Sequence, residues 1–535
     1  MPRTWTVMIY LSGNNNLAES CVYNLTEMRR ANLNDSIAVV AQLDSMVYSN
    51  QPITIENDET PGALNAVLEE AQKIRAVKNA KVKRAKPSNY GEEIFDFVRD
   101  TVRQYKADHY MLVLLGHGGG PANDFLRRAN RGQVQSLTIP DVGKLVERIS
   151  KGPLRGSKID ILGFDSCLMS TAEMAYLVHN HVKVMIGSEG FEPEAGWPYK
   201  IFLEEMAKLA EKPGGGDYRA VKETARSQVC SYVKYYSDYQ AAAVSVDQSA
   251  CDLQHMKSLR KVIEQFSYTL CPYLDRGDDD IRNALILAHW EAQPYLNEQY
   301  VDLYDFCERL RFYCPKQKSD VHRVCQNIMN VIRGSEFELK AHQQALAGRN
   351  LKLAECHTPQ LADVDYREFD KSFVIHSCYG GATVQYSYGL SIYFPWAVPW
   401  DNPEDPQKLK DYSQLYFVKD TNWVDFLFAY LKNTKRAVRP GVGQPKGFEP
   451  FLTSRLFNEF LPTGVRNSGN DRNSGNDRNS GNDRNSGNDR GSNNRIGTMR
   501  NPATKFTDCD CEIGPTVSPT RRAGKKKGKR RATKA

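Results

Sequence analysis

Short apolar runs alternate with amphipathic stretches over the first part of the chain. Five runs, rich in β-branched and aromatic residues, are short enough to be buried strands. They cover residues 5–11, 37–43, 110–115, 159–164 and 182–187. Apolar residues recur at helical spacing between them, in residues 61–76, 91–105, 140–149 and 168–179. Because strands that alternate with helices form parallel sheets, this pattern predicts an α/β fold with a mostly parallel sheet covered on both faces.

The pattern of the second half is less regular. Residues 218–235, 276–293 and 423–431 have helical spacing, and residues 389–395 read as a strand. This half could extend the first sheet or form a second domain, and the pattern alone leaves both open.

The end of the chain has a different character. Residues 467–490 are four copies of Asn-Ser-Gly-Asn-Asp-Arg without any apolar side chain, so nothing can offset the entropy of ordering them. We expect residues 436–535 to be disordered. Residues 521–535 carry nine Lys and Arg and no acid. This basic end could contact nucleic acid or another acidic partner, and a solvated tail remains the alternative.

Composition narrows the class of protein. The net charge is +7, but the chain without its basic end is close to neutral, so its body gives no reason to expect nucleic-acid binding. The twelve cysteines are irregularly spaced and form no CxxC pair, which is typical of a reducing compartment. With no signal peptide or membrane-spanning run recognised, the sequence predicts a cytoplasmic protein.

Two of the predicted strands end in residues that suit nucleophilic catalysis. One strand leads to His117, which lies among glycines, and another leads to Cys167. Because the carboxyl ends of parallel strands meet at one edge of a sheet, we expect the imidazole and the thiol to lie together. The imidazole, or the helix predicted to start at residue 168, would give the thiol thiolate character. A lone cysteine is usually a core residue, and the other eleven are assigned to that role.

Several segments together resemble the clostripain family of cysteine peptidases. They are residues 5–17, the strand that leads to His117, residues 162–169, 187–199, 301–305, 389–395 and 421–427. The family shares a caspase-like fold with legumains, gingipains and caspases. The resemblance therefore implies a caspase-like three-layer α/β/α sandwich. It suggests a catalytic core at 1–210, a C-terminal α/β extension at 211–435 and the disordered tail.

The resemblance also implies roles for single residues. His117 and Cys167 match the catalytic pair, and the N–H groups of Gly118 and Cys167 would form the oxyanion hole. Cleavage after Arg or Lys is expected, with Asp165 as one acid of the substrate pocket. A second acid should follow the strand at 182–187, and the sequence leaves three candidates open: Glu189, Glu192 and Glu194.

Two further properties are implied by the family alone. The resemblance leaves calcium open as a cofactor, but the sequence contains no calcium-binding loop, and Asn14 stands where the family often has Asp. Self-cleavage is expected between His117 and Cys167, in a polar segment predicted to be a loop that contains Arg127, Arg128 and Arg131.

The sequence thus predicts a cysteine endopeptidase that acts through an acyl-enzyme on protein or peptide substrates. The alternative is a catalytically silent caspase-like scaffold, whose basic tail binds nucleic acid or another acidic partner.

Overall fold

The structure is a computed structural model that describes ten ranges of the chain. They are residues 3–44, 53–54, 90–123, 125–130, 133–212, 217–238, 244–296, 298–334, 372–396 and 412–437. Three predictions fall outside them: the helix at 61–76, the cleavage site at Arg131, and the tail with its repeats and basic end. Residues Met1–Arg436 include almost all of the described chain and belong to one compact unit.

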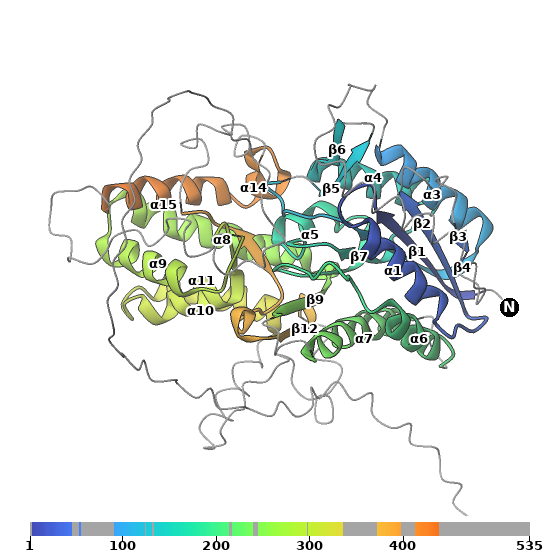
Figure 1. Ribbon diagram of the computed structural model, residues 1–535. Coiled ribbons are helices and arrows are strands. Elements are labelled where there is room, and N and C mark those ends of the chain that lie inside the picture. The colour runs from blue at the N-terminus through green and yellow to red at the C-terminus, as the bar shows by residue number, and fades with distance from the viewer. Residues whose placement is uncertain are drawn as a thin grey trace, which may run out of the picture. The chain divides into compact units, whose positions relative to one another are not determined.

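An eight-stranded sheet forms the centre of this unit, in the order β12-β9-β8-β7-β4-β1-β2-β3 (Figure 1). The five strands predicted from apolar runs are its parallel part, and β3, β9 and β12 are antiparallel to their neighbours. The strands are β1 (Arg3–Ser12), β2 (Ile37–Asp44), β3 (Ile53–Thr54), β4 (Ala107–Leu115), β7 (Ile159–Asp165), β8 (Val182–Gly187), β9 (Val246–Asp252) and β12 (Val374–Gly380). The mostly parallel sheet is therefore confirmed.

Helices cover both faces of the sheet, each over its own apolar core. Alternate residues of β1 and β4 point to opposite faces, so that Met8 and Leu112 belong to one core, and Val7 and Val113 to the other. One face packs on α3 (Tyr90–Gln104), α4 (Ile139–Lys151) and α5 (Ala172–Val178). The other packs on α1 (Ala18–Arg29), α6 (Tyr199–Ala210) and α7 (Tyr218–Ser237). In the described ranges, no helix is both apolar and long enough to cross a membrane.

The second half of the chain continues the same sheet. Strands β9 and β12 pair with each other, and β9 pairs with β8. The remaining elements share the buried cluster of α3, α4 and α5. They are α8 (Met256–Asp275), α9 (Asp279–Glu291), α10 (Leu303–Tyr313), α11 (Ser319–Arg333), α14 (Tyr416–Asp420), α15 (Trp423–Ala437) and a small sheet of β10 (Pro294–Tyr295), β11 (Tyr300–Asp302) and β13 (Ser391–Tyr393).

A hairpin follows the segment of His117, where a loop was predicted. Its strands are β5 (Phe125–Asn130) and β6 (Gln133–Leu137), so the prediction of a loop is wrong for Arg127 and Arg128. The Arg128 side chain is buried, and its guanidinium bonds Asp44 at 2.7 Å and Glu93 at 2.8 and 3.0 Å. It also lies 3.7 Å above the ring of Tyr90. Ion pairs with the end of β2 and with α3 therefore keep this basic residue inside the protein.

Loss of the Arg128 guanidinium should destabilise the fold. In Arg128→Met, Asp44 keeps its buried charge without a cationic partner, and we expect a loss of about 3–5 kcal/mol in the free energy of unfolding. Urea denaturation followed by circular dichroism measures it. Arg127→Met, at the exposed neighbouring position, is the control and should change stability by less than about 0.5 kcal/mol. Equal effects of the two substitutions would contradict this account.

Candidate active site

His117 and Cys167 lie beyond the ends of two adjacent parallel strands. Leu115 of β4 pairs with Asp165 of β7, and each candidate residue comes two positions after its strand's paired residue. Gly118 lies against the segment that follows β7. A Cβ atom on Gly118 would be 2.3 Å from the carbonyl oxygen of Cys167. Only glycine allows this approach without movement of the backbone. The two segments are thus in direct backbone contact.

The Cys167 thiol lies under the segment that follows β8. The backbone N–H of Glu192 donates to Sγ at 3.3 Å, and Sγ lies 3.8 Å from the Glu192 carbonyl oxygen. Burial raises the pKa of the Cys167 thiol to about 12, and the Glu192 N–H opposes this rise. At neutral pH the sulfur is therefore a protonated thiol in this conformation.

The helix predicted to begin at residue 168 begins later. Leu168 has a φ of 64°, in the left-handed region, which costs roughly 1–2 kcal/mol for a residue with a Cβ atom. Its N–H donates to the carbonyl of Gly190 at 3.0 Å. Helix α5 starts at Ala172 with Thr171 as its N-cap, so the prediction that a helix N-terminus directly follows Cys167 is wrong. A turn at Leu168 therefore separates Cys167 from the helix.

The two N–H groups expected to bind an oxyanion are available. In the described part of the chain, neither the Gly118 nor the Cys167 N–H donates to a carbonyl or side chain of another residue. The contact between Gly118 and the Cys167 carbonyl holds the two backbone segments close together. Two N–H groups that have no acceptor in another described residue therefore lie in adjoining backbone segments.

The His117 ring is oriented by the turn after β1. Its Nε2 lies 2.7 Å from Oδ1 of Asn16, a contact that the sequence analysis did not predict. The pKa of His117 is lowered, first by burial, while Glu194 acts to raise it and Arg127 to lower it. The ring is therefore neutral at physiological pH and has an amide, not a carboxylate, as its partner.

Two acids lie buried beside the thiol. Asp165 accepts hydrogen bonds from the Trp197 N–H at 3.1 Å and the Tyr199 hydroxyl at 2.8 Å. The Glu192 carboxylate oxygens are buried, and the polar side chains that face them are Asp165 and Ser188. Burial raises the pKa of both acids, and each lies next to the other. Two facing carboxyls in a dry site cannot both ionise, so the pair holds a shared proton.

The other two candidate acids lie elsewhere. Glu189 accepts a hydrogen bond from the Gly389 N–H at 2.7 Å and faces Asp302, which ties it to the second half of the chain. Glu194 is exposed and acts on His117. Of the three candidates, the structure therefore brings only Glu192 together with Asp165.

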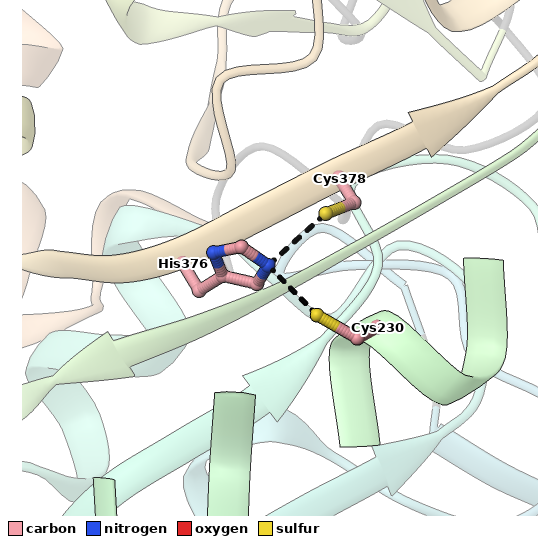
Figure 2. Close-up of side chains that lie close together, drawn as sticks. All are labelled: Cys230, His376 and Cys378. Atoms are coloured by element: carbon pink, nitrogen blue, oxygen red, sulfur yellow. Dashed lines mark hydrogen bonds between the residues drawn. The ribbon is translucent and has the colours of Figure 1, made fainter. Parts of the chain in front are cut away.

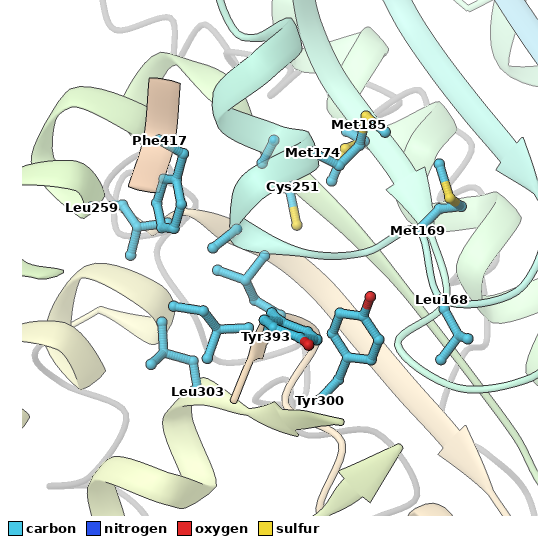
Figure 3. Packing of buried hydrophobic residues seen from close by; sticks show 14 of the residues in the cluster. Leu168, Met169, Met174, Met185, Cys251, Leu259, Tyr300, Leu303, Tyr393 and Phe417 are labelled. Carbon is cyan, nitrogen blue, oxygen red and sulfur yellow. The ribbon is translucent and has the colours of Figure 1, made fainter. Parts of the chain in front are cut away.

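The small sheet of β10, β11 and β13 contacts the segment that follows His117. The Tyr300 hydroxyl accepts from the Ala122 N–H at 3.1 Å and lies 3.3 Å from the Gly119 carbonyl oxygen. Leu168 and Met169 belong to the same buried cluster as Tyr300 (Figure 3). The second half of the chain thus holds both the glycine segment after His117 and the turn after Cys167.

A buried thiol–imidazole contact joins helix α7 and strand β12 (Figure 2). Nε2 of His376 is 3.2 Å from Cys230 Sγ and 3.1 Å from Cys378 Sγ, and all three residues are buried. Within the described ranges this is the one group with the spacing of metal ligands. However, Cys378 is disulfide-bonded, so its sulfur is not a thiolate ligand. Burial also keeps a peptide substrate from Cys230, and we assign neither a metal nor catalysis to this group.

The turn after β1 does not fit a calcium site. Asn15 Oδ1 accepts from the Leu17 N–H at 2.8 Å, and Asn16 Oδ1 contacts His117. Calcium requires six or more oxygen ligands, and the amide oxygens of Asn15 and Asn16 are already engaged.

Comparison with known proteins identifies the family. The family model described as the clostripain family matches residues 9–430, which is most of the chain. This chain belongs to the clostripain family. The family consists of cysteine peptidases, in agreement with the enzyme class predicted from the sequence.

Individual similarities are more distant. Clostripain from Hathewaya histolytica is 22% identical over 355 residues, which cover 57% of this chain and 65% of that protein. A secreted C11 cysteine protease from Bacteroides thetaiotaomicron, solved with an irreversible peptide inhibitor, is 15% identical and covers 79% of this chain and 99% of its own, with a TM-score of 0.49. An inactive zymogen C11 protease from Parabacteroides distasonis is 16% identical, with 79% and 99% coverage and a TM-score of 0.45.

Proposed function

We propose that this protein is an endopeptidase that cleaves after Arg or Lys, with Cys167 as nucleophile and His117 as proton carrier. The observation that carries the proposal is the arrangement at one sheet edge. A thiol and an imidazole follow two paired strand ends, and a buried pair of acids lies beside the thiol.

The proposed reaction follows from the protonation states. As Sγ of Cys167 attacks the carbonyl carbon of the substrate, the thiol proton passes to His117. The Gly118 and Cys167 N–H groups stabilise the developing oxyanion. His117 then gives the proton to the leaving amine, the C–N bond breaks, and an acyl-enzyme forms. Water hydrolyses the acyl-enzyme and restores the thiol.

The acid pair supports a preference for a basic side chain. The charged groups that act on Glu192 are Asp165 and Asp247, both acidic, and no Lys or Arg of the described residues pairs with it. A buried carboxylate without a cation is costly. An arginine or lysine of the substrate would supply that cation and displace the shared proton.

Replacement of Cys167 should abolish hydrolysis of an arginyl aminomethylcoumarin peptide. Cys167→Ala removes the only atom that forms the acyl-enzyme in this proposal, so we expect activity at background. Cys230→Ala, which removes the thiol that contacts His376, is the matched control and should retain turnover. The catalytically silent scaffold would be favoured if the wild-type protein cleaved neither basic nor neutral substrates.

Neutralising Glu192 should weaken selection for arginine. We expect kcat/KM for an arginine substrate to fall about 10- to 100-fold in Glu192→Gln, the worth of a hydrogen bond to a charged group, with a norleucine substrate little changed. Since burial raises the pKa of both acids, that of Asp165 to about 6, the wild-type preference for arginine over norleucine should increase as the pH rises through this value. Glu194→Gln is the control. A larger effect of Glu194→Gln would instead make Glu194 the pocket acid.

Self-processing, if it follows the proposed specificity, should occur after Arg131. Arg127 and Arg128 both lie within β5. The Arg127 carbonyl accepts a hydrogen bond from Asn15 and the Arg128 side chain is buried, so neither can enter the active site without unfolding of the hairpin. Arg131 falls between the ends of β5 and β6, outside the described residues. Intact-mass analysis should give two fragments for the wild-type protein and one chain for Cys167→Ala and for Arg131→Gln. A single chain in all three proteins would remove the proposal.

A further inference from the structure

The hydrogen bond between Asn16 and His117 defines which ring nitrogen carries the proton. The contact joins Asn16 Oδ1 and His117 Nε2 at 2.7 Å. An amide oxygen can only accept a hydrogen bond, so Nε2 carries the proton of the neutral ring. The lone pair of the ring is then on Nδ1, and this nitrogen is the one able to take a proton from the thiol.

Strand β5 contacts both the turn that carries Asn16 and the segment of His117. Nδ2 of Asn15 donates to the carbonyls of Ser12 and Arg127, both at 2.9 Å. The N–H of Leu126 in turn donates to the His117 carbonyl at 2.8 Å. The hairpin strand β5 therefore holds the turn of Asn16 and the backbone of His117 at the same time.

The base of this turn is fixed as well. Ser12 Oγ lies 2.7 Å from the Tyr90 hydroxyl, and a Cβ atom on Gly13 would be 2.8 Å from the Leu43 side chain. The turn that carries the exposed Asn16 is thus anchored at its base, which limits the positions from which its amide can contact the imidazole.

A neutral partner suits the second half of the reaction. A carboxylate at the position of the Asn16 amide would stabilise the imidazolium and make it a weaker acid. The charged side chains that act on His117 are Glu194, from the segment after β8, and Arg127, from β5, and their effects oppose each other. With an amide at Nε2, the protonated ring remains acidic enough to give its proton to the leaving amine.

We propose that Asn16 is the positioning residue that fixes the tautomer and the direction of His117 and keeps its imidazolium acidic. The role of Asn16 in turnover rests on the proposed function, whereas its effect on the tautomer and pKa of His117 does not.

The test compares Asn16→Asp and Asn16→Ala with the full-length wild-type protein. Histidine labelled with carbon-13 at Cε1 allows the pKa of His117 to be measured by NMR, with His117→Gln identifying its signal. We expect Asn16→Asp to raise the pKa of His117 by roughly 1–2 units, because it places a carboxylate at the ring. In the kinetic arm, Asn16→Ala should lower kcat by about tenfold or more with KM little changed. In Asn16→Asp, the acidic limb of the pH profile of activity should shift to higher pH together with the pKa of His117.

Two results would overturn the proposal. One is a His117 pKa that is the same in Asn16→Asp as in the wild-type protein; the other is a kcat of Asn16→Ala within about twofold of wild type. Thermal unfolding of each variant separates a loss of fold from a loss of positioning. The NMR titration does not depend on turnover, so a failure of the proposed peptidase activity would be seen separately from a failure of this inference.

Discussion

The parallel pairing of Leu115 with Asp165 is the constraint on which the candidate site depends. Since the two strands are in register, the residues two positions further on emerge at the same level of the sheet edge. Gly118 then lies against the Cys167 carbonyl, where any side chain would force the segments apart. A shift of one residue in this register would turn the functional side chains to the opposite faces of the sheet.

The second half of the chain is needed to support this edge. Tyr300 contacts the glycine segment, and Glu189 reaches the backbone of Gly389. Asp247 of β9 accepts hydrogen bonds from the N–H groups of Glu189 and Gly190 at 2.7 and 2.9 Å, which holds the segment that leads to Glu192. The position of the pocket acid therefore depends on a strand more than fifty residues away in sequence.

The sequence predicted the features that depend on apolar periodicity. The parallel strands, α3 and α4 follow from it, and Thr138 caps α4 through the capping box with Asp141. Strand β9 was missed because its sequence, VDQSACD, is polar although every residue is buried. Features set by tertiary contacts were also missed: the burial of Arg128, the left-handed Leu168, and the bond between Asn16 and His117. The choice among three nearby acids in one irregular segment could not be made from pattern at all.

The central claim is that Cys167 is the nucleophile and that Glu192 and Asp165 select a basic side chain. Affinity labelling tests both parts in one experiment. The protein would be treated with a peptidyl-arginine chloromethyl ketone and with its norleucine counterpart, and the modified peptide located by mass spectrometry. The account predicts a single adduct on Cys167 that forms faster with the arginine reagent, and a loss of that preference in Glu192→Gln. Adduct formation on another cysteine, or equal rates for the two reagents in the wild-type protein, would contradict it.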